Sequence, residues 1–136
     1  MLFRSRPATA SSTTQSYGPA AAVDGNPGSY WESANNAFPQ WIQIDLGAST
    51  SVGRVVLGLP SGWERRTQTL AISGSTNGSA FSALSGSAGR TFDPGSANQV
   101  TVTFPSAATR YLRITVTANT GWPAGQASAV EVYQTT

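Results

Sequence analysis

The stretch Trp41-Ile42-Gln43-Ile44-Asp45-Leu46 alternates strictly and stops at Gly47. Because successive side chains of an extended strand point to opposite faces, Ile42, Ile44 and Leu46 share one face of the segment. An alternation of this kind, closed by a glycine, is typical of a β-strand that buries one side. The segment therefore predicts a sheet with an apolar core on one of its faces.

Further stretches of the chain repeat this pattern. We expect strands at residues 7–12, 52–59, 67–73, 81–84, 100–104, 110–117 and 129–133. Residues 86–98 have the composition of a loop, with Phe92 as its apolar anchor. No apolar period near 3.6 extends beyond a single helical turn at residues 20–23. Many short strands separated by turns predict an all-β domain, either an antiparallel sandwich or a barrel.

Composition bounds the number of domains and the class of partner. The chain of 136 residues is long enough for one domain, which we place at residues 7–134, with residues 1–6 as a linker. All eight basic residues are arginine, and they are scattered, for a net charge of +2. Nucleic acid is not an expected partner, because phosphate binding needs clustered basic side chains. No stretch approaches the roughly 18 apolar residues of a membrane helix, so membrane insertion is not expected either.

The chain contains neither cysteine nor histidine. Disulfides, thiolate metal sites and thiol nucleophiles are thereby excluded, as is a serine-histidine-aspartate triad. Carboxylate chemistry remains, and Glu32 with Glu64 is the pair that could serve a small glycosidase, which needs two carboxyl groups about 5 to 10 Å apart. The sequence has no cofactor motif and no long active-site loop, so binding is preferred over catalysis.

The loop at residues 21–29 carries a dense set of oxygen atoms. Asp24, Asn26 and Ser29 supply a carboxylate, an amide and a hydroxyl, and the glycines and proline between them let backbone carbonyls turn inward. Calcium takes six to eight oxygen ligands of these types, so one interpretation is a metal site. The same residue types dominate turns for conformational reasons, so the other interpretation is an ordinary turn. The loop by itself leaves the two alternatives equally open.

Four loops hold the side chains that sugar recognition needs. If the strands alternate in direction, residues 13–19, 32–40, 60–66 and 118–127 emerge at one end of the domain. Sugars present apolar C–H faces and rings of hydroxyls, so a site combines aromatic platforms with amide, carboxylate and guanidinium groups. The candidate carbohydrate-binding residues are Tyr17, Asn35, Asn36, Trp63, Glu64, Arg65, Arg66, Trp122 and Gln126.

The four tryptophans have different expected roles. Trp31 is expected in the core, and Trp41, which begins a strand, at the rim of the sandwich. Trp63 and Trp122 lie in loops next to glycine or proline, so we favour exposed ligand platforms for both. The alternative is that each folds back and caps the end of the sandwich.

Four motifs occur in order along the chain. They are Ala22-Val23-Asp24-Gly25-Asn26 with Tyr30-Trp31, then Trp41-Ile42-Gln43-Ile44-Asp45-Leu46-Gly47, then Arg110-Tyr111-Leu112-Arg113-Ile114, and finally Ala129-Val130-Glu131-Val132-Tyr133. Together they resemble the discoidin family, also called the coagulation factor type C domain, over nearly the whole chain. The resemblance implies a jelly-roll-like antiparallel β-sandwich with ligand-binding loops at one end. Bacterial domains of this kind are commonly carbohydrate-binding modules of secreted glycoside hydrolases.

The resemblance also implies one structural calcium ion. Carried over by position, its ligands are the carbonyl of Ala21, the side chains of Asp24 and Asn26, the hydroxyl and carbonyl of Ser29, the carbonyl of Val130 and the carboxylate of Glu131. This ligand set favours calcium over an empty turn. We expect the ion to join the two ends of the chain at one pole of the sandwich, with the sugar-binding loops at the opposite pole.

The preferred interpretation is a non-catalytic carbohydrate-binding module of a secreted, extracellular glycoside hydrolase. Three segments, Pro39-Gln40-Trp41-Ile42-Gln43, Arg66-Thr67-Gln68-Thr69-Leu70 and Thr120-Gly121-Trp122-Pro123-Ala124, are similar to discoidin-type modules of actinobacterial glycoside hydrolases, including α-1,3-glucanases. The expected partner is therefore an insoluble α-glucan, bound by a monomeric domain that is tethered to a catalytic domain and to sister modules. The alternative is an adhesion module for a protein or phospholipid surface, in which Trp63 with Arg65 and Arg66 would make the contact.

Overall fold

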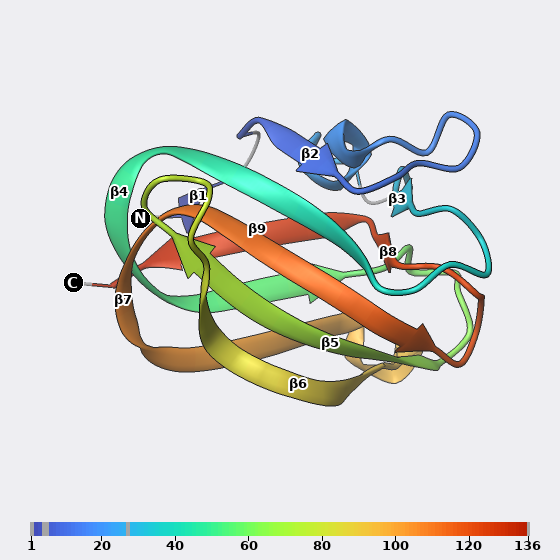
Figure 1. Ribbon diagram of the computed structural model, residues 1–136. Helices are drawn as coiled ribbons and strands as arrows, with labels where there is room; N and C mark the ends of the chain where they lie inside the picture. Colours follow the sequence, from blue (N-terminus) through green and yellow to red (C-terminus); the bar gives the residue numbers. More distant parts are fainter. Residues whose placement is uncertain (1, 4–5, 27, 136) are drawn as a thin grey trace.

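Two long antiparallel strands, β4 (Gln40–Gly58) and β7 (Gln99–Asn119), form the frame of the fold. Their pairing is interrupted between Asp45 and Thr50 and again between Val52 and Arg54. Gly47, at a φ of 89°, lies in the first interruption and adopts a backbone conformation that glycine tolerates best. Figure 1 shows both strands curving back at the left, so each contributes to both layers of a β-sandwich.

The computed structural model describes residues 2–3, 6–26 and 28–135. The other strands there are β1 (Leu2–Phe3), β2 (Ala8–Ala10), β3 (Trp31–Glu32), β5 (Arg66–Ser75), β6 (Ser82–Phe92), β8 (Gln126–Ala127) and β9 (Ala129–Gln134), with short 3-10 helices η1 (Pro19–Ala22) and η2 (Pro94–Ser96). The main sheet has the order β1-β9-β4-β7-β5-β6, with β2 added along β4, and β3 pairs with β8 separately. Every pairing is antiparallel. The expected all-β sandwich is confirmed.

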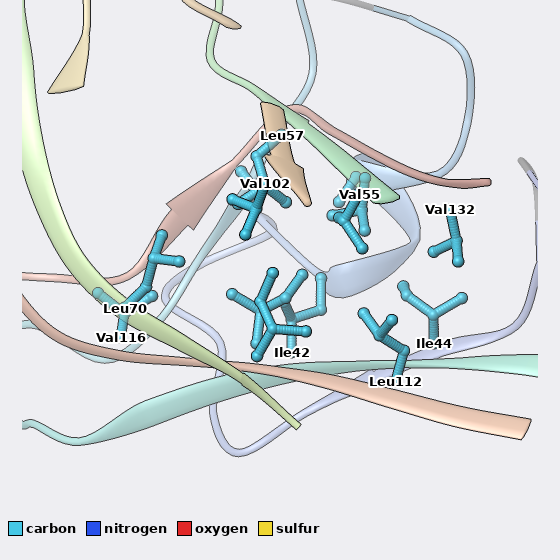
Figure 2. Packing of buried hydrophobic residues seen from close by; sticks show 14 of the residues in the cluster. Ile42, Ile44, Val55, Leu57, Leu70, Val102, Leu112, Val116 and Val132 are labelled. Carbon is cyan, nitrogen blue, oxygen red and sulfur yellow. The ribbon is translucent and has the colours of Figure 1, made fainter. Parts of the chain in front are cut away.

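The core lies between the two layers and is built from the alternating apolar residues of the strands. Ile42 and Ile44 of β4 and Leu112 of β7 are at most 1% exposed, and they face Val55 and Val132 (Figure 2). Burial of each such side chain stabilises the fold by about 1.5–3 kcal/mol. The alternation seen in the sequence is therefore the pattern that fills the sandwich.

Three expectations about strand boundaries are wrong. Residues 52–59 and 100–104 do not form separate strands, because β4 and β7 continue through their bends. Residues 86–98 are not all loop, since β6 extends to Phe92. The Ser- and Gly-rich β6 is a sheet edge held by its pairing with β5, so it needs little apolar alternation of its own. Phe92 is buried, as expected of an anchor.

The segment expected to be a linker contributes to the sheet. Leu2 pairs with Tyr133 and Phe3 with Val132, which makes β1 an extra edge strand beside β9. A first strand is confirmed at Ala8–Ala10, and the expected helical turn is η1. No helix in the described part of the chain is long and apolar enough to cross a lipid bilayer.

Candidate functional site

A hollow of about 440 Å³ opens at the end of the sandwich that carries β3 and β8, away from the chain termini (Figure 1). We call this hollow the cleft. All four loops that were expected to emerge together contribute to it. The residues that line the cleft are Gln15, Tyr17, Tyr30, Glu32, Asn35, Trp63, Glu64, Arg66, Gly121, Trp122 and Gln126. Its size is in the range of small-molecule sites, about 300–1,000 Å³.

Three aromatic rings of the cleft form a contiguous row. Tyr17 and Tyr30 stack with their ring centroids 4.6 Å apart and their planes 12° apart. Tyr30 in turn meets Trp63 edge to face at 4.6 Å and 74°. The guanidinium carbon of Arg66 lies 4.6 Å from the centroid of the Trp63 ring. Burial, with a contribution from Tyr17, raises the pKa of Tyr30 to about 12, so its hydroxyl stays protonated at neutral pH.

Gln126 is the centre of a hydrogen-bond network in the cleft. Its Oε1 accepts from Arg66 Nη1 at 3.0 Å and from Asn119 Nδ2 at 3.1 Å, and its Nε2 donates to Glu32 Oε1 at 2.8 Å. Its backbone N–H and C=O are both bonded to the amide of Gln68 at 3.0 Å. These partners fix the orientation of the Gln126 amide. The same hydrogen bonds hold the side chains of Arg66 and Glu32 in place before any ligand binds.

The cleft is locally acidic in a chain whose net charge is +2. Of the six acidic residues, Glu32 and Glu64 line the cleft, and Arg66 is the one arginine among its lining residues. Burial lowers the pKa of Arg66, and the charges of Glu64 and Glu32 oppose that shift. The side chains of the cleft thus favour neutral or cationic ligands over polyanions.

Trp122 stands at the open edge of the cleft. It is 47% exposed, and its indole N–H donates to Asn35 Oδ1 at 3.3 Å. The loops that carry these two residues are also joined through their backbones, since the N–H of Asn36 donates to the carbonyl of Pro123 at 2.8 Å. A large exposed aromatic ring next to hydrogen-bonding groups is the arrangement that sugar binding uses.

The structure brings most of the predicted sugar-binding residues together. Seven of them line the cleft: Tyr17, Asn35, Trp63, Glu64, Arg66, Trp122 and Gln126. Asn36 and Arg65 do not. Asn36 instead shapes its loop, with a φ of 61°. Arg65 precedes the start of β5 and does not line the cleft, whereas its neighbours Glu64 and Arg66 do.

Sequence reasoning missed Gln15, Tyr30, Glu32 and Gly121 as cleft residues, although Glu32 was considered for catalysis. A usable signal was present at Tyr30 and Glu32. They flank Trp31, whose ring is completely buried and donates to the carbonyl of Ser12 at 3.0 Å. Alternation about a core tryptophan therefore places Tyr30 and Glu32 on the side away from Trp31.

The tryptophans differ in burial. Trp31 is a core residue, as expected. Trp41 is half-buried on the sheet, where the guanidinium carbon of Arg113 lies 4.1 Å from its ring centroid. Trp63 is not exposed as expected, because it is half-buried: it lines the cleft and also packs against the core.

Oxygen atoms converge in the loop at residues 21–29, which we call the metal loop. The Ser29 hydroxyl donates to Asp24 Oδ2 at 2.6 Å and lies 3.1 Å from the Asn26 carbonyl and 3.4 Å from the Ala21 carbonyl. Asp24 Oδ1 accepts from the N–H of Asn26 at 2.9 Å. The bonds from Ser29 and Asn26 lower the pKa of Asp24, so its carboxylate is charged at neutral pH.

A cavity of about 210 Å³ separates the metal loop from the start of β9. Its lining residues include Gly25 and Asn26 on one side and Val130 and Glu131 on the other. No cluster of three or more His, Cys, Asp or Glu side chains occurs in the part of the chain that the structure describes. The donors are carbonyl, amide, hydroxyl and carboxylate oxygens, which fit a hard cation such as calcium better than a transition metal.

The expectation that the metal loop and the sugar-binding loops lie at opposite poles is wrong. Ser29 belongs to the metal loop, and the next residue, Tyr30, lines the cleft. Consecutive Cα atoms are about 3.8 Å apart, so the two regions adjoin. The chain ends meet elsewhere, where β1 pairs with β9 (Figure 1).

Comparison with protein families finds one that covers nearly the whole domain. The family described as F5/8 type C domain matches residues 7–131. Among curated protein sequences, no match to this chain was found.

Solved structures resemble the chain over almost its full length. The CBM32 of AlyQ in complex with 4,5-unsaturated mannuronic acid is 23% identical, with 99% of each chain covered and a TM-score of 0.82. Chitosan-binding module 1 of a chitosanase/glucanase from Paenibacillus sp. IK-5 is 28% identical, with 96% of each chain covered and a TM-score of 0.72. The family 32 CBM of C. perfringens NanJ in complex with galactose is 20% identical, covers 96% of this chain and 94% of that chain, and has a TM-score of 0.79. Their similarity agrees with a β-sandwich of the same fold.

Proposed function

The chain belongs to the F5/8 type C domain family, and we propose that it is a non-catalytic carbohydrate-binding module. The observation that carries the proposal is the cleft, in which exposed Trp122 and the aromatic row surround hydrogen-bonding groups fixed by Gln126. The similar structures described above include modules in complex with 4,5-unsaturated mannuronic acid and with galactose and a chitosan-binding module, which supports the ligand class.

Different residues of the cleft would contact different parts of a bound sugar. Trp122 supplies an apolar surface for the C–H face of a pyranose ring. Arg66 donates two hydrogen bonds within the protein, to Gln126 Oε1 and to the Glu64 carbonyl, which leaves N–H groups for sugar oxygens. Glu32 accepts from Gln126 through Oε1, and its second oxygen can accept from a sugar hydroxyl.

Within the class of polysaccharides we propose a neutral α-glucan, with α-1,3-glucan as the first choice. Support comes from the resemblance of the sequence to modules of α-1,3-glucanases and from the acidic cleft, which disfavours uronate polymers. The test is co-sedimentation of the purified domain with insoluble α-1,3-glucan, starch, cellulose, chitosan and alginate gel. Retention on α-1,3-glucan alone supports the proposal. Retention on chitosan or alginate but not on α-1,3-glucan would support a carbohydrate-binding function and overturn the choice of glucan.

A binding module of this kind acts by targeting. Tethered to a secreted glycoside hydrolase, it would hold the catalytic domain at an insoluble substrate outside the cell, and several weak sites on one chain would add avidity. Because Glu32 and Glu64 line the same cleft, a turnover assay of the isolated domain on the retained polysaccharide is the necessary control. Hydrolysis that disappears in Glu64→Gln would overturn the non-catalytic assignment.

We also propose a structural calcium ion at the metal loop. The Ala21 carbonyl, Asp24, Asn26 and Ser29 would hold it from one side, where the Ser29 hydroxyl already contacts the other three. The Val130 carbonyl and Glu131 would complete the site from β9, because that segment lines the same cavity. The ion would join the metal loop to β9 and so support the adjoining cleft residue Tyr30.

An adhesion module for a lipid surface is the second candidate. One observation favours it, since the two exposed large apolar side chains of the described residues, Trp122 and Phe38, belong to loops joined by the backbone bond from Asn36 to Pro123. Co-sedimentation with vesicles of neutral and anionic phospholipid separates the candidates. Vesicle binding without binding to any polysaccharide would replace the sugar proposal.

A further inference from the structure

The turn that presents Trp63 to the cleft is held by a side chain that does not line the cleft. Residues 60–63 form a tight turn, in which the N–H of Trp63 donates to the carbonyl of Pro60 at 3.1 Å. Asn98, from the segment just before β7, donates through Nδ2 to the Pro60 carbonyl at 2.9 Å and to the Trp63 carbonyl at 3.0 Å. Both ends of the turn are thus bonded to one amide group.

Asn98 is itself fixed from several directions. It is completely buried, its N–H donates to the carbonyl of Asp93 at 2.9 Å, and its carbonyl accepts from the N–H of Leu59 at 3.0 Å. Its φ of 52° lies in the left-handed region, which asparagine tolerates better than most residues. The orientation of the amide is unambiguous, because the two atoms that it meets are carbonyl oxygens and only Nδ2 can donate to them.

This arrangement leaves one buried polar atom unpaired. Asn98 Oδ1 has no hydrogen-bond partner among the residues that the structure describes. An apolar side chain of the same size would fill this space but could not donate to either carbonyl. What the amide supplies is its pair of donors, and both go to the turn that carries Trp63.

The position of Trp63 matters to the rest of the cleft. Its ring meets Tyr30 edge to face and lies under the Arg66 guanidinium, so a shift of the indole would displace a neighbour on each side. We infer that Asn98 is a positioning residue for ligand binding: it holds the indole of Trp63 in the aromatic row without contacting the ligand. The inference rests on the proposed function, because it assigns a role in the same cleft.

The experiment is a double-mutant cycle with α-1,3-glucan as the probe. Asn98→Gly removes the amide and suits the left-handed backbone. We expect it to weaken binding roughly fivefold or more in the parent chain and less than about twofold in the Trp63→Ala background, because residues that act through one another are not additive. An equal loss in both backgrounds, or no loss in the parent chain, would overturn the inference.

A second readout separates positioning from general destabilisation. The indole N–H signal of Trp63 in an NMR spectrum of the free Asn98→Gly domain should shift or broaden, while that of Trp31 stays in place. Ser75→Ala is the matched control, since Ser75 is a buried polar residue that bonds Asn77 and Gly78 in a turn at the other end of β5. It should leave both the indole signal and glucan binding unchanged.

The two readouts also distinguish the failure of this inference from the failure of the proposed function. If the domain retains no polysaccharide, the proposed function fails, and the indole signal still decides whether Asn98 positions Trp63. If glucan binding depends on Trp63 and the indole signal is insensitive to Asn98→Gly, the proposed function stands and the inference is wrong.

Discussion

The cleft and the metal loop adjoin each other, yet they are assembled in opposite ways. Most of the proposed calcium ligands come from one continuous segment, Ala21 to Ser29, and their oxygen atoms converge through bonds within that segment. The cleft draws its lining from four loops spread between Gln15 and Gln126, together with Tyr30, which follows the metal loop. A local site depends on turn chemistry, whereas an assembled site depends on the sheet that brings its loops together. The two regions should therefore respond differently to perturbation.

The largest effect is expected at Trp31, where the comparison should break because β3, which carries Trp31, adjoins the cleft and also packs on η1 at the start of the metal loop. Trp31 lies between Tyr30 and Glu32, is fully buried, and packs so closely on Gly125 that a Cβ there would lie 3.0 Å from the indole. Trp31→Ala should lower the free energy of unfolding by about 3–5 kcal/mol. Urea denaturation measures this loss, and a change below about 1 kcal/mol would contradict the core role.

Removal of calcium should come next and should act mainly on the metal loop. If free calcium is roughly 100 times its Kd, chelation removes about 2.7 kcal/mol of stabilisation, a fall in Tm of roughly 5–10 °C. Melting curves with a chelator and with added calcium measure it. Chelation should lower the Tm of Asp24→Asn less than that of the parent domain. It should lower the Tm of Asp93→Asn, a variant outside the loop, as much as that of the parent. A melt that is insensitive to exhaustive chelation would remove the metal proposal.

Trp122→Ala should act on the cleft alone. Because the side chain is 47% exposed, stability should change by less than about 0.5 kcal/mol. Loss of the ring should weaken glucan binding by about 1–2 kcal/mol, roughly tenfold in Kd. The matched control is Phe38→Ala, since Phe38 is 37% exposed and does not line the cleft. If Trp122→Ala binds glucan as tightly as Phe38→Ala does, Trp122 is not the aromatic platform of the site.

The smallest effect is expected at a pair that belongs to neither region. Arg110 Nε lies 3.0 Å from Asp45 Oδ1 on the surface of the sheet, and its hydrogen bond lowers the pKa of Asp45. A lowered carboxyl pKa stabilises the fold above the ordinary pKa of aspartate, and this contribution disappears as the pH falls through the lowered value. Asp45→Asn should therefore slightly reduce the free energy of unfolding at pH 7. It should also make that free energy fall less between pH 7 and pH 3 than in the parent chain. Chemical denaturation at pH 7 and pH 3 measures both, and identical pH profiles for the two chains would contradict this.

Much of the fold could be predicted from the sequence because its periodicity is local. The alternation of Trp41 to Leu46 predicted the first half of β4, and the buried face is the one expected. The bends of β4 and β7 could not be predicted in the same way. A strand that continues through a bend and two strands joined by a turn carry the same pattern, and Gly47 fits both.

The candidate site shows the same limit. Exposed Trp122 in a Gly-Pro context was a usable signal, and the residue lines the cleft. Gln126 was predicted as a ligand residue, but its bonds to Glu32, Arg66 and Gln68 connect positions far apart in the chain. Asn98 gave no signal at all, since its role depends on a turn that begins at Pro60, 38 residues earlier in the chain.

The sequence by itself determined the all-β class, the buried faces of the strands, the family and the set of oxygen donors in the metal loop. Each of these is a property of neighbouring residues, because alternation and turn chemistry act over a few positions. The tertiary structure alone decided that the cleft gathers side chains from Gln15 to Gln126, that Gln126 bonds to Glu32 and Arg66, and that Asn98 holds Trp63. These contacts join distant segments, and they exist only once the folded-back sheet of β4 and β7 has set where each loop emerges.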